Sequence, residues 1–274
     1  MKRVYLTALT NERYIPGVMA LAQSLYKVKS AYELAIMIPA EKKDSLGAAL
    51  QQYGILDIPG TFLLLKENIQ LAEMDIVVEQ TYCYWRDSFF KIQAADCEEY
   101  DKIILLDCDQ LVVKNIDHLF DRPAFTATTC GRCVHENWLN LSSGLLVLEP
   151  SIELHKKLCS LIQPAIAFKQ EKGLQAGDQD VFNLAYPEWR NCPDLYLHEK
   201  YNICWGWISD LCRKENVKPE DFYMIHFPGK EKPWDFGKYY HLRILLSYLR
   251  RGKLDKLRYK VYIWRKYRRL CECK

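Results

Sequence analysis

The sequence has no long apolar run at its ends or in its interior. The opening stretch MKRVYLTALTNERY lacks the apolar core and small-residue cleavage site of a signal peptide, so we expect none. No segment reaches the roughly 18 consecutive apolar residues that span a bilayer. Internal repeats and low-complexity linkers are also missing. These absences predict a cytoplasmic protein without a membrane-spanning helix.

Eleven cysteines are present, but they lack the pattern of a disulfide framework. Their number is odd, their spacing is irregular and the chain is long enough to bury a large core, so we expect free thiols. Cys130 and Cys133 form a CxxC, yet no second CxxC or His pair lies at zinc-finger spacing, which disfavours a structural metal or a redox pair. Cys271 and Cys273 are too few to form a site.

Charge is distributed unevenly along a chain whose formal net charge is +3. From Arg250 to Lys274, eleven Lys and Arg oppose two acids, a net of +9 that leaves −6 for residues 1–249. Leu, Ile, Tyr and Trp alternate with these charges, as is typical of a segment on an anionic membrane. The alternatives are a solvated charged helix and a nucleic-acid surface, but no nucleic-acid-binding fold accompanies the segment. We therefore expect peripheral attachment to the inner face of a membrane and no nucleic-acid partner.

The first half of the chain alternates strand and helix patterns. Continuous apolar strands separated by helices indicate a sheet covered on both faces, which predicts an α/β fold with a mostly parallel central sheet. We expect one Rossmann-like nucleotide-sugar-binding domain at 1–240 and a basic, aromatic helical tail at 241–274. The expected strands are 3–9, 33–40, 61–65, 102–109, 111–114, 125–130, 142–150 and 222–227, and the expected helices are 14–29, 42–53, 85–95, 115–120, 151–168 and 178–186.

The segment ILLDCDQLVVKNIDHLF places two acids, Asp107 and Asp109, at the end of an apolar strand. Residues two apart in a strand point the same way, so both carboxylates aim at one point while Cys108 faces the other side. Open α/β sheets bind ligands at the carboxyl ends of their strands. Converging carboxylates stay ionised when a cation lies between them, and oxygen ligands suit Mg²⁺ or Mn²⁺ shared with substrate phosphates.

Spacing alone leaves two other interpretations of the acidic pair open. Asp107 and Asp109 could cap the following helical turn or pair with surface lysines. A phosphatase could use the first acid as a nucleophile. Such sites normally carry a Thr shortly after the second acid, and Gln110, Leu111 and Val112 do not supply one.

Five segments together resemble glycosyltransferase family 8, the family of glycogenin and of bacterial lipopolysaccharide galactosyl- and glucosyltransferases. They are LTNERYIPGVMALAQSL, LLDCDQLVVKNIDHLF, SSGLLVLEPS, GDQDVFN and HFPGKEKPW, in family order across nearly the whole expected domain. The glycogenin branch is the most similar, because FFKIQAADC aligns with its corresponding segment and the HFxGxxKPW spacing is kept. The resemblance implies a GT-A type fold, a UDP-sugar donor and Mn²⁺, with Mg²⁺ as the alternative ion.

The resemblance also implies a role for each matching residue. Asp107, Asp109 and His226 would hold the metal, with Asp107 also contacting the ribose. Gly229 and Lys232 would reach the diphosphate, where a lysine stabilises the departing nucleotide. The remaining implied residues are Thr10, Asn11 and Tyr14 at the uracil, Lys91, Cys108, Ser142, Ser143 and Gly144 at the rest of the donor, and Asp178 and Gln179, which would act in catalysis together with Lys91 beside the anomeric carbon.

Outside the family context, these residues have ordinary structural explanations. His226 on an apolar strand would be a satisfied core or surface histidine. Lys91 would extend from its helix to solvent, and Lys232 would be solvated in a Pro-Gly turn. Asn11 and Asp178 would be helix caps.

The implied reaction is the transfer of a hexose from a UDP-sugar to an external glycan or lipid-linked acceptor, with retention of configuration. Two routes remain open, a covalent intermediate on Asp178 or same-face attack guided by the leaving diphosphate. A self-glucosylating primer is a second hypothesis, but Tyr201 and Asn202 are followed by ICWGWISDL, with no tyrosine at the matching place. Trp205 and Trp207 could stack on an acceptor sugar or belong to the core. A third hypothesis is an inactive UDP-sugar-binding partner at the membrane.

Overall fold

A computed structural model describes residues 1–69, 87–129, 131–230, 232–235, 246, 248–250 and 254–271. Cys130, Cys273 and the first two residues of the helix expected at 85–95 lie outside these ranges, as does most of the stretch 236–253.

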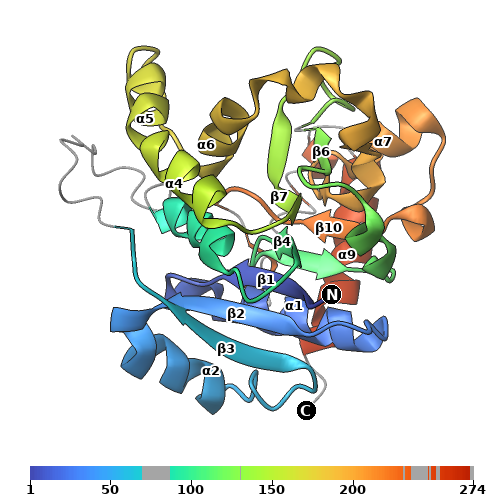
Figure 1. Cartoon of the computed structure of the whole chain (residues 1–274). Helices are drawn as coiled ribbons and strands as arrows, with labels where there is room; N and C mark the ends of the chain where they lie inside the picture. Colours follow the sequence, from blue (N-terminus) through green and yellow to red (C-terminus); the bar gives the residue numbers. More distant parts are fainter. Residues whose placement is uncertain are drawn as a thin grey trace.

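A seven-stranded sheet forms the centre of the domain (Figure 1). Its strands are β1 (Arg3–Ala8), β2 (Leu34–Pro39), β3 (Thr61–Lys66), β4 (Lys102–Leu106), β6 (Ala127–Thr129), β7 (Leu141–Leu148) and β8 (Tyr196–Leu197). Their order is β3-β2-β1-β4-β7-β6-β8. The first four strands run parallel, β7 is antiparallel to both β4 and β6, and β8 is parallel to β6. The predicted α/β class with a mostly parallel sheet is confirmed.

Helices cover both faces of this sheet. The α-helices are α1 (Ile15–Lys27), α2 (Ala48–Gln52), α4 (Ile152–Ser160), α5 (Ile162–Gln170), α6 (Asp178–Ala185), α7 (Ile208–Glu215) and α9 (Leu254–Cys271). The shorter helical turns are η1 (Glu12–Tyr14), η2 (Ala40–Lys42), η3 (Lys43–Gly47), η5 (Phe89–Asp96), η6 (Asp117–Asp121), η7 (Pro187–Asn191), η8 (Pro193–Leu195), η9 (Glu199–Tyr201), η10 (Pro219–Asp221) and η11 (Pro233–Asp235).

Alternation along the strands divides the core into two layers. On β4, Ile103 and Leu105 pack with η5, α4, α5 and α6, whereas Ile104 and Leu106 pack with α1 and α2. This is the period-two alternation of a strand whose two faces are both covered. The sheet therefore offers its carboxyl-terminal edge, and not its faces, to a ligand.

A second, smaller sheet lies beside the first. It contains β5 (Gln110–Val112), β10 (Met224–His226) and β9 (Ile203–Cys204), with β10 antiparallel to β5 and parallel to β9. Its apolar side chains form a third buried cluster with residues of α7 and α9. Because β5 follows β4 almost directly, this sheet brings the late strand β10 next to the acidic pair.

Several predicted elements have different bounds. The helix expected at 42–53 is a succession of η2, η3 and the short α2. The helix expected at 151–168 is interrupted at Leu161, because Pro164 lacks an amide hydrogen and its ring conflicts with the carbonyl four residues earlier, at Ser160. The described part of the helix expected at 85–95 contains the 3₁₀ turn η5. None of the helices described is long and apolar enough to cross a membrane.

Candidate active site

The candidate site lies at the carboxyl ends of β1 and β4, where the strand order of the sheet reverses. Strand β1 lies between β2 and β4, so the strand order reverses between β1 and β4. Open α/β sheets bind their ligands at such a reversal. Thr7 pairs with Leu106, which places the residues that follow each strand side by side. The expected strand 102–109 ends at Leu106, and both acids lie in the turn before β5. The prediction that the strand carries them was therefore wrong.

Asp107, Asp109 and His226 converge at this edge of the sheet. One ligand atom of each lies within 4.8 Å of the others. The His226 Nε2 atom lies 3.3 Å from Asp107 Oδ2 and 3.2 Å from Asp109 Oδ1. We call residues 107–109 the acidic turn. The amide of Phe227 donates to the Asp109 carbonyl at 3.0 Å, which connects the end of β10 to this turn. Among the residues described, this is the one group of three or more His, Cys, Asp or Glu with metal-ligand spacing.

Gln110 and Asn202 hold the acidic turn in place, and the sequence analysis did not assign either a role. The Asp107 amide donates to Gln110 Oε1 at 3.0 Å. Gln110 Nε2 donates to the Gly144 carbonyl at 2.6 Å and to Asn202 Oδ1 at 2.9 Å. Asn202 Nδ2 in turn donates to Ser142 Oγ at 3.3 Å. The sequence does contain a signal for this network, because Gln110 begins the apolar run QLVV. A buried amide side chain in such a run usually has hydrogen-bond partners.

Two glycines give the acidic turn the space it occupies. A Cβ atom at Gly144 would lie 3.0 Å from Asp107 Oδ2, His226 Cε1 and Asn202 Nδ2. A Cβ atom at Gly17 on α1 would lie 2.5 Å from the Cys108 carbonyl oxygen, closer than real contacts allow. The Cys108 side chain packs with the core layer that contains α1 and α2, and burial raises the pKa of its thiol. Cys108 therefore faces away from the acidic side chains.

Lys91 is buried between two carboxylates. Its Nζ atom lies 2.6 Å from Asp107 Oδ1 and 2.8 Å from Asp178 Oδ2, and it donates to the Ser143 carbonyl at 3.0 Å. Burial alone would lower the pKa of Lys91, but Asp107 and Asp178 raise it above its ordinary value. The explanation of Lys91 as a solvent-exposed helix residue was therefore wrong, because only 7 % of the residue is exposed.

Lys232 is a second buried lysine, and it pairs with the other acid of the turn. It is 2 % exposed, forms an ion pair with Asp109 and donates to the Phe227 carbonyl at 2.7 Å. Its Nζ atom lies 5.1 Å from the centre of the Tyr14 ring. Burial and the charge of Asp109 raise the pKa of Tyr14, which keeps its phenol neutral. A solvated Lys232 in a Pro-Gly turn is therefore excluded.

Residues after β1 contact the segment that follows β10. We call residues 226–230 and 232–235 the donor loop. Arg13 donates to the Lys230 carbonyl at 3.1 Å and forms an ion pair with Asp235 at 2.8 Å. Asn11 is exposed, and its side chain accepts from the Arg13 amide at 2.9 Å, so it does cap η1. The Thr10 carbonyl accepts from Lys42 Nζ at 2.7 Å.

Gly229 adopts a φ of +87°, and nothing lies within 4 Å of a Cβ placed on it. Backbone conformation, and not lack of space, therefore requires glycine there.

Asp178 begins α6 and is 6 % exposed. Its amide donates to Ser88 Oγ at 3.1 Å. The cap position belongs to Gly177, whose amide donates to Asp180 Oδ2 at 3.0 Å, so the explanation of Asp178 as the helix cap was wrong. Gln179 is half-buried next to it. Lys91 thus joins Asp178 to the acidic turn.

The donor set at the convergence point fits a hard divalent cation. Two carboxylates and one imidazole supply oxygen and nitrogen ligands of the kind that Mn²⁺ accepts. Burial alone would raise the pKa of Asp109, but His226 and Lys232 lower it well below its usual range, so this ligand is ionised. Gly144 leaves free the space beside Asp107 and His226 that a larger residue would fill.

The aromatic residues of ICWGWISDL differ in their surroundings. Trp205 is 7 % exposed and belongs to the third buried cluster, so it is a core residue. Trp207 is half-buried, and its ring lies 6.4 Å from that of Trp138, which is 44 % exposed. A Cβ at Gly131 would lie 2.7 Å from Trp207, so the backbone there packs directly on the indole.

Comparisons with known proteins agree with this arrangement. The model of the glycosyl transferase family 8 matches residues 6–132. Human glycogenin-1 is 23% identical over 244 residues, covering 85% of this chain and 63% of its own length. A UDP-glucuronate:xylan alpha-glucuronosyltransferase 2 from Arabidopsis thaliana is 26% identical over 243 residues, covering 85% of this chain and 36% of its own. The chain thus spans less than two thirds of these relatives.

Solved structures show the same fold. An active-site mutant of LgtC superposes with a TM-score of 0.59 at 13% identity, covering 84% of this chain and 89% of that one. The glycosyltransferase GlyE from Streptococcus pneumoniae TIGR4 gives 0.55 at 19% identity, covering 85% and 57%. The sheet, its neighbours and the Asp-Asp-His group define a GT-A type α/β fold with a candidate metal centre. The family-model match over residues 6–132 and the similarity to glycogenin-1 support an assignment to glycosyltransferase family 8.

Proposed function

We propose that the protein is a Mn²⁺-dependent retaining glycosyltransferase that moves a hexose from a UDP-sugar to an external glycan or lipid-linked acceptor. The observation that carries this proposal is the convergence of Asp107, Asp109 and His226 at the sheet reversal. Each acid also pairs with a buried lysine, Asp107 with Lys91 and Asp109 with Lys232. A site with three candidate metal ligands and two buried lysines suits a metal-bound diphosphate, because both lysines can pair with phosphate oxygens.

Each residue has a proposed part in donor binding. Asp107, Asp109 and His226 hold the divalent ion, which neutralises charge on the diphosphate as it leaves. Thr10, Asn11 and Tyr14 lie on the loop after β1 and bind the uracil. Gly229 and Lys232, on the donor loop, bind the diphosphate. Residues for the sugar side are Lys91, Ser142, Ser143, Gly144, Asp178 and Gln179.

Lys91 links the two halves of this arrangement. It pairs with Asp107 on the metal side and with Asp178 on the sugar side. A cation that contacts both carboxylates keeps Asp178 oriented toward the donor, either as the nucleophile of a covalent route or as a charge that stabilises an oxocarbenium-like sugar in same-face attack.

The donor is identified by titration with each of a panel of UDP-sugars in the presence of Mn²⁺, followed by slow donor hydrolysis. We expect one UDP-hexose to be hydrolysed fastest, with release of UDP that stops when EDTA removes the ion and resumes when Mn²⁺ is added back. Mg²⁺ tests the alternative ion in the same assay. A protein that binds no UDP-sugar and releases no UDP with either ion would contradict the proposed activity.

A glycogenin-like primer is the second candidate, favoured by the similarity to human glycogenin-1. Intact mass measured in the same reactions separates the two functions. Added hexose units on the chain itself would support self-glucosylation, whereas an unchanged mass with donor turnover supports an external acceptor. An inactive binding partner predicts binding without turnover.

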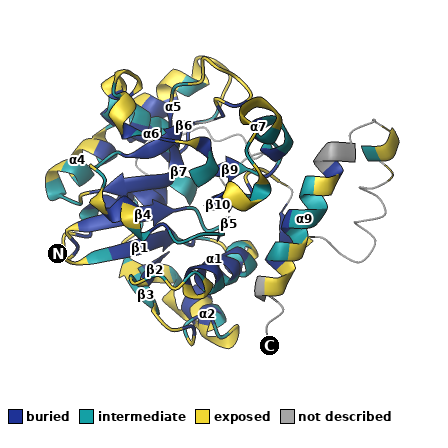
Figure 2. Cartoon of the chain, turned by 90° about the vertical axis from the view of Figure 1, so that its right-hand side faces the viewer, coloured by how far each residue is buried: buried dark blue, intermediate teal, exposed yellow. Residues whose placement is uncertain are grey.

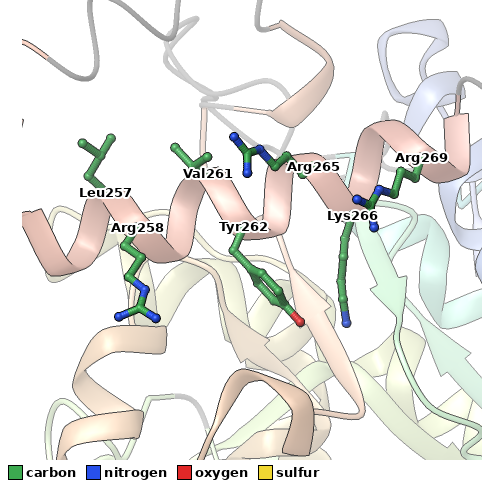
Figure 3. A pocket seen from close by; sticks show the side chains of 7 residues that line it. All are labelled: Leu257, Arg258, Val261, Tyr262, Arg265, Lys266 and Arg269. Carbon is green, nitrogen blue, oxygen red and sulfur yellow. The ribbon is translucent and has the colours of Figure 1, made fainter.

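We also propose that the tail attaches the protein peripherally to the anionic inner face of a membrane. A groove of about 610 Å³ runs along α9 (Figure 3). Its lining includes four basic residues, Arg258, Arg265, Lys266 and Arg269. Each basic residue near an anionic surface contributes about 1 kcal/mol to binding. A row of them along one helix supplies a continuous attractive surface.

Replacing Arg258, Arg265, Lys266 and Arg269 with Gln together is expected to reduce binding to phosphatidylserine-containing vesicles by about a hundred- to a thousand-fold. Vesicle co-sedimentation measures this. The matched control carries four Gln at the exposed residues Lys29, Lys43, Lys156 and Arg190, which removes the same charge elsewhere. Equal binding by the two quadruple variants would contradict a specific role for α9. Truncation is a poorer test, because α9 also contributes to a buried cluster.

A further inference from the structure

Helix α9 has both buried and exposed residues (Figure 2), and two of its buried apolar residues belong to the third buried cluster. Ile263 and Tyr267 are four residues apart and so share one face of the helix. They are 0 % and 4 % exposed and belong to the third buried cluster with Leu111, Ile203 and Ile225 of the smaller sheet. The docking of α9 therefore rests on buried apolar contacts next to β10, the strand that carries His226.

Tyr267 contacts both the start of α1 and the donor loop. Its hydroxyl donates to the Pro16 carbonyl at 3.0 Å. Its ring centre lies 5.9 Å from that of Phe227, edge to face, and 6.1 Å from that of Trp234. These two contacts lie near opposite ends of the donor loop. One side chain of α9 thus bridges the loop and the helix that follows β1.

Phe227 and Trp234 lie next to the residues that face the acidic pair. Phe227 follows His226, and its amide donates to the Asp109 carbonyl at 3.0 Å. Trp234 packs against Gly17 so closely that a Cβ there would lie 2.8 Å from the indole. A displacement of either ring would therefore shift the backbone that positions the metal and diphosphate ligands, because a packed interior transmits small movements.

A second contact from α9 supports the same strand. Lys260 Nζ lies 4.3 Å from the centre of the Trp205 ring, a cation–π distance. The Trp205 ring lies 5.6 Å from that of Phe227, and the Trp205 amide donates to the His226 carbonyl at 2.9 Å. Two side chains of α9 thus reach the His226 backbone through one layer of aromatic residues.

We infer that α9 supports the donor site from behind, with Tyr267 as a positioning residue that sets the donor loop against the acidic turn. The inference rests on the proposed function, since it concerns how the metal-bound diphosphate is held. It gives the tail a role in catalysis in addition to the proposed membrane contact. Tyr267 touches neither the reacting atoms nor the donor, and it acts through Phe227 and Trp234.

The test compares Tyr267→Phe, which removes the hydroxyl and keeps the ring, with Tyr267→Ala, which removes both. Tyr26→Phe is the matched control, because Tyr26 lies on α1 and is 54 % exposed. The first measurement is deuterium exchange at the amides of Phe227 and Trp205, which needs no ligand. The second is the affinity for UDP in the presence of Mn²⁺. We expect faster exchange at both amides and an affinity about three- to ten-fold weaker for Tyr267→Phe, a larger loss for Tyr267→Ala, and no change for the control.

The outcomes separate the inference from the proposed function. Wild-type exchange at both amides in folded Tyr267→Ala would overturn the inference, and so would an increase spread evenly over the central sheet, which would indicate general destabilisation. UDP affinity equal to that of the wild type in both Tyr267 variants would also overturn it. A wild-type protein that binds no UDP with Mn²⁺ contradicts the proposed function, and the exchange comparison still decides whether α9 positions the donor loop.

Discussion

Asp109→Asn is expected to lower donor turnover by about two to three orders of magnitude, because in the proposed mechanism it removes an ionised ligand from the divalent ion that stabilises the leaving diphosphate. Asparagine has nearly the same size as aspartate, so the acidic turn keeps its shape. The change leaves Lys232 buried without its carboxylate partner, and a buried unpaired charge is costly. Some loss of stability should therefore accompany the loss of rate.

Release of UDP from the preferred UDP-hexose, followed across a range of Mn²⁺ concentrations, measures this effect. A variant that regains rate at high Mn²⁺ has lost metal affinity, whereas one that stays slow at saturation has lost stabilisation of the leaving group. Asp44→Asn is the matched control, since Asp44 is an exposed aspartate on η3. Full turnover by Asp109→Asn at low Mn²⁺ would remove Asp109 from the metal site.

Much of the site could be anticipated from local patterns because its parts lie at strand ends. Asp107 and Asp109 follow an apolar strand, and a parallel sheet places such positions at one edge. His226 ends an apolar strand as well, and its place in HFPGKEKPW predicted, by resemblance, that it is a metal ligand. Asp107 and Asp109 lie in a turn and not in the expected strand, yet their side chains still converge. The contacts of Gln110 with the Asp107 amide and the Gly144 carbonyl hold this turn against β7.

The environments of the two lysines could not be predicted from their own segments. Lys91 pairs with Asp107, 16 residues away, and Lys232 with Asp109, 123 residues away. A long flexible side chain in a local pattern usually extends to solvent, and only the tertiary fold reveals the carboxylates that pair with it. The network of Gln110 and Asn202 spans 92 residues and was missed for the same reason.

The basic residues of the tail made its apolar helical pattern harder to recognise in the sequence. Eleven basic residues dominate the segment from Arg250 to Lys274 and favour a surface role. Within it, Ile263 and Tyr267 have helical spacing, and this apolar pair sets how α9 docks. Both properties belong to one helix, so a basic surface and a buried support for the donor loop are compatible. The division of the chain at residue 240 remains a prediction.

Lys91→Met is expected to lower the free energy of unfolding by about 3–5 kcal/mol, because it removes the buried cation that Asp107 and Asp178 share while both carboxylates stay within the fold. Methionine replaces the length of the side chain without its charge. Chemical denaturation in the presence of EDTA measures the change without a contribution from bound metal.

A second substitution tests whether the loss comes from uncompensated charge. Adding Asp178→Asn to Lys91→Met removes one of the stranded carboxylates and should restore more than about 1 kcal/mol, since the two residues form one ion pair and their effects are coupled. Lys66→Met is the comparison, because Lys66 forms a more exposed pair with Asp96 at 3.0 Å and should cost about 0–1 kcal/mol. Two outcomes would contradict this role of Lys91: a loss of stability in Lys91→Met no larger than that in Lys66→Met, or a double variant that is less stable than Lys91→Met alone. Either result would mean that Lys91 does not balance the charge of the two acids. The proposed link between the metal side and the sugar side of the site would then be wrong as well.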